Sequence, residues 1–290
     1  MVLSKVRKKI NDYATLVMFS HTIFSLSFAV ISMMLASKGR PSVHTIFWII
    51  VAFMGARTGA NAINRVIDAE IDAKNPRTVM RQLPQRMLKK KEVIVFTAVC
   101  FLVMVIAAAM LNPLCVMLSP IALFLMIIYS YTKRFTWTCH LVLGITSAAA
   151  PVGAWIAVTG EISWVALFMG AANTLWVSGF DIIYGAQDYE FDTINGIHSI
   201  PARFGIKNAL CFAALFHVVA VILLVFVGIL SGELGVIYYI GLGIISILFI
   251  IEHRIVSPDN LTNVKIASYG INQIISITFL IFGFVAVIVK

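Results

Sequence analysis

A short acidic segment near residue 70 has a spacing that suits chemistry. In NRVIDAEID, the side chains of Asn64, Asp68 and Asp72 are four residues apart. An α-helix places residues i and i+4 above one another, so this spacing puts all three on one helical face. The sequence therefore predicts a ladder of polar groups that point to one place.

A second acidic segment, DIIYGAQDYEFD, repeats this pattern further along the chain. Asp181, Asp188 and Asp192 are separated by seven and four residues, which again predicts one helical face. Tyr184 precedes Asp188 by four residues, as Asn64 precedes the first acid of its own segment. Both segments follow an apolar run, so we expect both motifs on loops at the same membrane face.

Stacked carboxylates repel one another, and a charge near the membrane is costly without a partner. A shared divalent cation relieves both costs. Carboxylate oxygens suit Mg²⁺, which commonly bridges a few carboxylates to substrate phosphates. We therefore predict that Mg²⁺ is held by Asp68, Asp72, Asp188 and Asp192, and that these acids are catalytic. The alternative is that they are solvated loop residues, which two clusters in matching positions make less favourable.

Basic residues accompany the acids at this face. Arg and Lys side chains together with Mg²⁺ are the groups that bind a phosphate or diphosphate. The competing interpretation is ordinary anchoring of the chain by positive charge. The basic residues concerned are Arg77, Arg81, Lys133, Arg134 and Arg203.

Arg57 differs from these because it lies inside an apolar run, two turns before Asn64. An ionisable residue within a membrane span indicates a functional site. Arg57 is a candidate to bind an acidic substrate or the diphosphate, or to pair with one of the acids.

The composition decides the class of protein. The chain has 290 residues, of which 60% are hydrophobic and only 12% charged. Its mean hydropathy of +0.96 is typical of a polytopic membrane protein. We predict an all-α fold, a single bundle of nine transmembrane helices. The expected spans are 13–37, 43–64, 93–111, 114–132, 138–159, 163–183, 208–231, 234–251 and 267–289.

Lys and Arg predict the orientation of the bundle. They concentrate before the first span and in the loops after the second, fourth, sixth and eighth spans. The positive-inside rule puts these segments in the cytoplasm, with the C-terminus outside. We expect an integral, multi-pass protein of a bacterial inner membrane, in contact with membrane lipid. The net charge of +9 then reflects topology, and no basic domain for nucleic acid is present.

The chain is expected to form a single domain over residues 1–290. The two acidic motifs end the second and sixth spans, which hints at an internal duplication of spans 1–4 and 5–8. The four cysteines lie in or beside apolar spans without metal-ligand spacing, so we expect them to pack in the core. No obligate protein partner is evident.

These motifs resemble the UbiA superfamily of intramembrane aromatic prenyltransferases. Members carry N-x-x-x-D-x-x-x-D followed by R-T and a further Arg. Here these are Asn64, Asp68, Asp72, Arg77-Thr78 and Arg81. The family's second motif, D-x-x-Y-x-x-x-D-x-x-x-D followed by G-I-x-S, is similar to Asp181, Tyr184, Asp188, Asp192 and GIHS at 196–199. YSYTKRFTW at 129–137 resembles the segment that supplies a diphosphate-binding Lys, which implies that role for Lys133.

The resemblance implies a reaction. Mg²⁺ and the basic residues would bind a polyprenyl diphosphate, and stabilising the departing diphosphate would leave an allylic cation. The aromatic ring of an acceptor would attack that cation, and Asp188 or Asp192 would remove the ring proton. The resemblance also implies substrate contacts from Asn64, Arg77, Arg81, Lys133, Asp181 and Tyr184. They add to the contact that we expect from Arg57 because of its position inside a span.

The acceptor and some rival functions stay open. HTIFSLSFA and NRVIDAEIDAKNPRT resemble the 4-hydroxybenzoate polyprenyltransferase-like branch, which implies ubiquinone-type quinone biosynthesis. Aminodeoxyfutalosine or another menaquinone precursor, and haem, are alternative acceptors. From another class, a cation-coupled secondary transporter would also carry membrane acids, although nearer to mid-bilayer.

Overall fold

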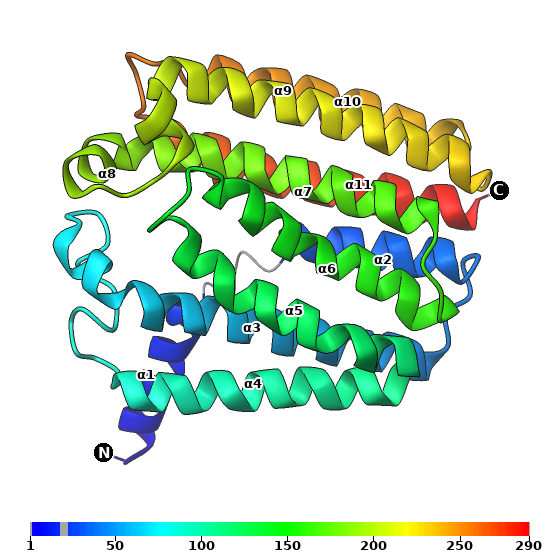
Figure 1. Cartoon of the computed structure of the whole chain (residues 1–290). Coiled ribbons are helices and arrows are strands. Elements are labelled where there is room, and N and C mark those ends of the chain that lie inside the picture. The colour runs from blue at the N-terminus through cyan, green and yellow to red at the C-terminus, as the bar shows by residue number, and fades with distance from the viewer. Residues whose placement is uncertain (1, 18–22, 290) are drawn as a thin grey trace.

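The apolar segments form long helices that run alongside one another in the computed structural model (Figure 1). The structure describes residues 2–17 and 23–289. Within them the regular structure is helical, which agrees with the predicted all-α class. The helices are α1 Val2–Leu16, α2 Ile23–Ala36, α3 Val43–Lys74, α4 Lys90–Leu111, α5 Pro113–Thr132, α6 Cys139–Thr159, α7 Trp164–Gly185, the short η2 Ala186–Asp188, α8 Tyr189–Asn195, α9 Ile200–Ser231, α10 Val236–Arg254, the π-helical η3 Ile266–Ile271 and α11 Asn272–Ile288.

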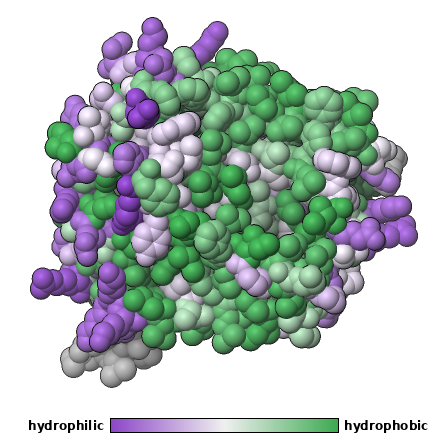
Figure 2. Space-filling view, in the orientation of Figure 1, coloured by the Kyte–Doolittle hydropathy of each residue, from purple (hydrophilic) through white to green (hydrophobic). Residues whose placement is uncertain are grey.

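The described chain contains eight segments long and apolar enough to cross a membrane. Many large apolar side chains on their outer faces are exposed, including Leu102, Phe124 and Ile247. Figure 2 shows the result as a broad hydrophobic surface, with hydrophilic residues gathered towards its two edges. Such a surface needs a lipid environment, so the chain is an integral, multi-pass membrane protein.

The first expected span, 13–37, differs from its prediction. α1 ends at Leu16 and α2 begins at Ile23, while residues 18–22 lie outside the described part of the chain. α2 has 14 residues, about 21 Å of helix, which is shorter than a hydrocarbon core of about 30 Å. The count of nine spans therefore stays a prediction.

The other eight expected spans correspond to helices, but α3 is longer than predicted. It continues ten residues beyond 64, so Asn64, Asp68 and Asp72 lie within the helix and not on a loop. It ends at Lys74 and is capped by Asn75, whose backbone is extended (φ −85°, ψ 120°). Pro76 follows and disfavours a helical conformation at the residue before it, which explains why the helix stops there.

The second acidic motif is also built differently from its prediction. α7 ends at Gly185, a 3₁₀ turn covers Ala186–Asp188, and α8 then begins at Tyr189. The motif is therefore not one continuous helical face. A 3₁₀ turn winds more tightly than an α-helix, so it shifts the face on which Asp188 lies relative to Asp181. The two acids contact different partners.

The helices pack largely in chain order. α3, α4, α5 and α6 pack in sequence, as do α7, α9, α10 and α11, and α6 packs extensively against α7, while α2 contacts both α6 and α11. The largest buried core surrounds Trp176 of α7, Phe28 of α2 and Phe279 of α11. Gly55 allows α3 to lie close to α4, since any larger residue would place its Cβ 2.7 Å from the carbonyl oxygen of Cys100. This close packing holds the helix that carries the first acidic motif.

Candidate active site

A cavity of about 690 Å³ is lined mainly by α3, α4, α5, α6 and α7, with its polar end where α3 and α7 finish. We call this the acidic end of the bundle. Every residue that the motifs single out for the site lines this one cavity: Arg57, Asn64, Asp68, Asp72, Arg77, Arg81, Lys133, Asp181, Tyr184, Asp188 and Asp192. Folding therefore gathers residues that are more than 100 positions apart in the sequence.

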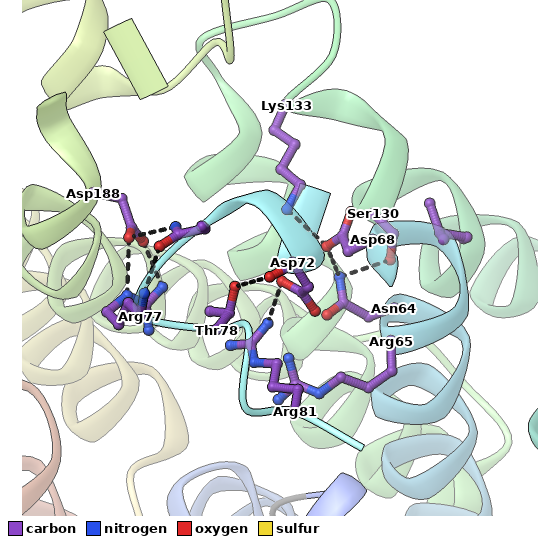
Figure 3. Close-up of polar contacts among 12 residues, drawn as sticks. Asn64, Arg65, Asp68, Asp72, Arg77, Thr78, Arg81, Ser130, Lys133 and Asp188 are labelled. Carbon is purple, nitrogen blue, oxygen red and sulfur yellow. Dashed lines mark hydrogen bonds and ion pairs between the residues drawn. The ribbon is translucent and has the colours of Figure 1, made fainter. Parts of the chain in front are cut away.

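Asp68 is the most contacted acid of the first motif (Figure 3). Lys133 at the end of α5 reaches its Oδ2 at 2.7 Å, and Arg134 reaches its Oδ1 at 3.2 Å. Asn64, one turn earlier on α3, donates to Oδ2 at 2.9 Å and also contacts Ser130 on α5. Asp68 is only 2% exposed, so these contacts compensate the loss of water around its charge.

Asp72 lies one turn further along the same face of α3. Arg81 donates to its Oδ1 at 2.7 Å, and the hydroxyl of Thr78 donates to its backbone carbonyl at 3.1 Å. Its Oδ2 is buried and has no hydrogen-bond partner. A buried carboxylate oxygen without a donor is costly, so Asp72 retains a lone pair for a ligand.

Arg77 connects the two acidic motifs. Its Nε donates to Asp188 Oδ1 at 2.9 Å, a second guanidinium nitrogen pairs with Oδ2, and Nη1 donates to the hydroxyl of Tyr184 at 2.6 Å. Asn75 donates to the same Asp188 at 2.9 Å. Burial alone would lower the pKa of Arg77, but the hydrogen bonds and charge of Asp188 outweigh burial and raise this pKa. Arg77 therefore stays charged.

Asp192 is held by the loop that follows it. Ser199 caps the start of α9 and its hydroxyl donates to Asp192 Oδ2 at 2.9 Å. Gly196 has φ +65°, which allows the turn between the two residues. The backbone N–H of His198 donates to the carbonyl of Lys133 at 2.7 Å. The GIHS loop therefore positions both an acid and the lysine of the first cluster.

Asp181 contacts a histidine and is separate from these ion pairs. His140 Nδ1 lies 2.7 Å from Asp181 Oδ2, and because a carboxylate can only accept, the imidazole donates. His140 is buried, whereas the side chain of Asp181 is 28% exposed. Since Asp181 also lines the cavity, its carboxylate is accessible there while the imidazole holds it in place.

Arg57 lies deeper in the cavity. It is seven residues before Asn64 on α3, about 10 Å along the helix axis. Tyr129 on α5 and Tyr269 on η3 also line the cavity, and Tyr269 packs edge-on against Tyr184. The cavity thus changes from charged at the acidic end to aromatic and then apolar further in.

Several contact residues were not predicted as part of the site. Asn75, Ser130, Arg134, His140 and Ser199 each hydrogen-bond or pair with a motif residue. Arg134 was noted as basic, but its contact with Asp68 depends on how α5 packs against α3. His140 has no ligand spacing in the sequence, so only its tertiary contact with Asp181 indicates a role.

The carboxylate side chains at the acidic end are chemically suited to bind a hard divalent cation. Within residues 2–17 and 23–289, no three His, Cys, Asp or Glu side chains form a ready metal-binding cluster, because the carboxylates are paired with basic residues. However, Asp68, Asp72, Asp188 and Asp192 line one cavity, and Asp72 Oδ2 has no partner. Carboxylate oxygens are the ligands that Mg²⁺ prefers, so the residues present are suitable for it.

The comparison with protein families decides the identity of the fold. The sequence model of the UbiA prenyltransferase family matches residues 25–285, which is most of the chain. The chain belongs to this family. As a UbiA-family member it is an enzyme, an aryl prenyltransferase, and the resemblance seen in the motifs is confirmed.

Curated UbiA-family relatives include enzymes named 4-hydroxybenzoate octaprenyltransferase. The protein from Vibrio campbellii is 30% identical over 225 residues, 78% of each chain. The protein of the same name from Francisella tularensis is 29% identical over 259 residues, 89% of each chain.

Solved UbiA-family structures share the fold. A UbiA homolog from Aeropyrum pernix K1 in its apo form is 30% identical, with a TM-score of 0.81 over 90% of this chain and 95% of that one. A UbiA homolog from Archaeoglobus fulgidus, bound to GPP and Mg²⁺, is 20% identical, with a TM-score of 0.68 over 95% of this chain and 99% of that one.

Proposed function

We propose that this UbiA-family enzyme transfers a polyprenyl group from a polyprenyl diphosphate to an aromatic acceptor, with 4-hydroxybenzoate as the first choice, and releases diphosphate. The acceptor is suggested by the names of the curated relatives. We place the protein in a bacterial inner membrane, with the acidic end and the N-terminus on the cytoplasmic side, because basic residues concentrate there.

The observation that carries this proposal is the balance of charge at the acidic end. Four carboxylates, Asp68, Asp72, Asp188 and Asp192, line one cavity together with the basic side chains of Arg77, Arg81 and Lys133. Arg134 lies outside this lining and adds a fourth basic group through its pair with Asp68. A diphosphate alone would add uncompensated negative charge, and a divalent cation alone would add positive charge. Together they restore the balance, with the basic groups turning from the acids to the phosphate oxygens.

Mg²⁺ is the cofactor we propose, held by Asp68, Asp72, Asp188 and Asp192. When bound, it would neutralise charge that develops on the leaving diphosphate. Lys133, Arg77 and Arg81 would bind the same phosphate oxygens, and Asn64 would keep Asp68 in place through its amide. The apolar walls further in would exclude water from the allylic carbon.

The acceptor would bind between Arg57 and Asp181. The guanidinium of Arg57 suits the carboxylate of a hydroxybenzoate, and Tyr184 and Tyr269 offer aromatic surfaces beside it. Asp181, oriented by His140, is suited to accept a hydrogen bond from the hydroxyl group of the acceptor. Asp192 is better suited than Asp188 to remove the ring proton. Ser199 hydrogen-bonds only one oxygen of Asp192, whereas Arg77 engages both oxygens of Asp188.

The deciding experiment uses purified protein in lipid vesicles with a polyprenyl diphosphate, Mg²⁺ and radiolabelled 4-hydroxybenzoate. We expect label to enter the organic phase, with equimolar release of diphosphate. Diphosphate release with aminodeoxyfutalosine but not with 4-hydroxybenzoate would change the acceptor and keep the mechanism. Failure to release diphosphate with every acceptor would contradict the enzyme assignment of this site and favour cation transport.

Removal of the metal gives a second expected result. Treatment with EDTA should lower turnover to background, because the four carboxylates would lose the cation that joins them to the diphosphate. Excess Mg²⁺ should restore the rate, whereas Ca²⁺ should restore it poorly, since it prefers longer bonds and more ligands. Full activity after EDTA would rule out the metal role of these acids.

Substitution of His140 tests the acceptor site. Loss of a hydrogen bond to a charged group is worth about 1.5–3 kcal/mol, so His140→Ala should lower kcat/KM for the acceptor about tenfold or more. The KM for the prenyl diphosphate should stay unchanged. His140→Gln keeps a donor at this position and should recover part of the loss. Equal changes in both KM values would instead indicate a general structural role for His140.

A further inference from the structure

A buried polar network lies beside the cavity, where α7, α9, α10 and the start of α11 meet. Glu252 on α10 is 0% exposed, and Asn272 on α11 and Trp176 on α7 are also buried. These three residues do not belong to the cavity lining. A buried carboxylate inside a membrane bundle is costly, and the proposed chemistry makes no use of this one. Its presence in the fold therefore needs an explanation.

Asn272 is the centre of this network. Its Oδ1 accepts from the indole Nε1 of Trp176 at 2.6 Å, and its Nδ2 donates to Glu252 Oε1 at 2.8 Å. An indole N–H can only donate and a carboxylate can only accept, so the orientation of the amide is fixed. The same Nδ2 donates to the carbonyl of Ala267 at 3.1 Å. An aspartate has no N–H and could not make this set of contacts.

Two histidines complete the network on the side of α9. The carbonyl of Trp176 lies 3.2 Å from His217 Nε2 and can only accept, so Nε2 carries the proton. His217 Nδ1 then accepts from His253 Nε2 at 3.0 Å. Glu252 Oε2 lies 3.8 Å from the same Nδ1, too far for a hydrogen bond. The hydrogen bond from Asn272 is therefore the contact that orients Glu252.

This network holds an unusual piece of backbone. η3, Ile266–Ile271, is a π-helical turn that packs against both α7 and α10. π-Helical turns are rare and are frequently found at functional sites. Asn272 directly follows the turn, and its amide joins the carbonyl of Ala267 within the turn to Glu252 on α10 and Trp176 on α7. The position of the turn is thus set by hydrogen bonds to two neighbouring helices.

Tyr269 is the residue of η3 that lines the cavity. Its ring packs edge-on against Tyr184, with the ring centroids 4.8 Å apart. Tyr269 is only three residues before Asn272, so a shift of the turn would move this ring within the cavity. The polar network and the aromatic wall of the acceptor site are therefore mechanically connected.

We propose that Asn272 is a positioning residue for the acceptor, and that it fixes the π-helical turn which presents Tyr269 to the acceptor ring. This inference rests on the proposed function and adds the means by which the acceptor is oriented. Aromatic rings attract one another in offset or edge-on arrangements, so a displaced Tyr269 binds the acceptor less well. The diphosphate of the donor binds at the acidic end and is unaffected.

The first variant is Asn272→Asp, which keeps the size of the side chain but places an oxygen against Glu252 Oε1. It is assayed in vesicles with geranyl diphosphate, Mg²⁺ and radiolabelled 4-hydroxybenzoate. We expect kcat/KM for the acceptor to fall about tenfold or more, with an unchanged KM for geranyl diphosphate. Adding Glu252→Gln exchanges amide and carboxylate across the same contact and should recover most of the loss.

Ser268→Ala is the matched control. Ser268 is buried in the same turn, and its hydroxyl has no hydrogen-bond partner among the residues that the structure describes. Ser268→Ala should therefore match wild type with both substrates. A loss in this control as large as that in Asn272→Asp would mean that any change in the turn disturbs the enzyme, and would overturn the specific role of Asn272.

A double-mutant cycle tests whether Asn272 acts through Tyr269. In a Tyr269→Ala background, Asn272→Asp should cause little further loss of kcat/KM for the acceptor. The full loss in that background would show that the two residues act independently. Equal losses for donor and acceptor would show a general structural role. Either result would overturn the proposal.

Glu252→Leu serves if Asn272→Asp does not fold. It removes the partner of the Asn272 amide without adding a charge, and an apolar residue of similar volume in place of a buried ion is often tolerated. The same acceptor-specific loss should appear, and a wild-type profile would overturn the proposal. A wild-type protein that turns over no prenyl diphosphate would instead contradict the proposed function itself.

Discussion

Replacing Asp68 by asparagine is expected to lower kcat/KM by about 10³-fold, which is comparable to losing a main electrostatic contact to the transition state. Asp68 is the acid on which Lys133, Arg134 and Asn64 converge. Its amide analogue would keep the volume but lose the charge that holds a cation and orients Lys133. Initial rates with a prenyl diphosphate and Mg²⁺, together with metal binding by calorimetry, measure both effects.

The matched control for Asp68→Asn is Glu70→Gln. Glu70 lies two residues further along α3 but is exposed and outside the cavity. Glu70→Gln should therefore retain the rate of the wild-type enzyme. Similar losses in both variants would show that net charge near the membrane, and not the position of Asp68 in the cavity, determines the activity.

Replacing Arg77 is expected to cost about 10²-fold or more in kcat/KM, and lysine should not rescue it. Arg77 engages both oxygens of Asp188, hydrogen-bonds Tyr184 and lies 4.8 Å over the ring of Tyr184. A lysine offers one compact charge and cannot reproduce this planar, two-pronged contact. Arg77→Ala and Arg77→Lys should therefore both raise the KM for the diphosphate donor and lower kcat.

A double-mutant cycle tests whether Arg77 acts through Asp188. If the pair works as a unit, Arg77→Ala and Asp188→Asn together should cost little more than either change alone. Lys90→Ala is the control for loss of a basic residue nearby, since Lys90 is exposed at the start of α4. Additive losses in the cycle would show that Arg77 and Asp188 contribute to binding independently.

Local periodicity explains why the first motif could be predicted so fully. Asn64, Asp68 and Asp72 are related by one helical turn each, and the geometry of a single helix is enough to place them together. Asn112 lies at the boundary between the two expected spans 93–111 and 114–132, and the helices α4 and α5 meet there. The apolar composition likewise determined the membrane bundle, because no soluble fold can cover so much apolar surface.

Only the tertiary structure decided which partners these residues meet. The second motif does not form one continuous α-helical face, because a 3₁₀ turn interrupts it at Ala186–Asp188. Asp181 contacts His140, whereas Asp188 contacts Arg77. Arg134 and Lys133 converge on one carboxylate because α5 packs beside α3. The sequence determines contacts within a few turns of helix, where backbone geometry alone sets the distances. Contacts between helices depend on the packing of many side chains at once, so they become visible only in the folded bundle.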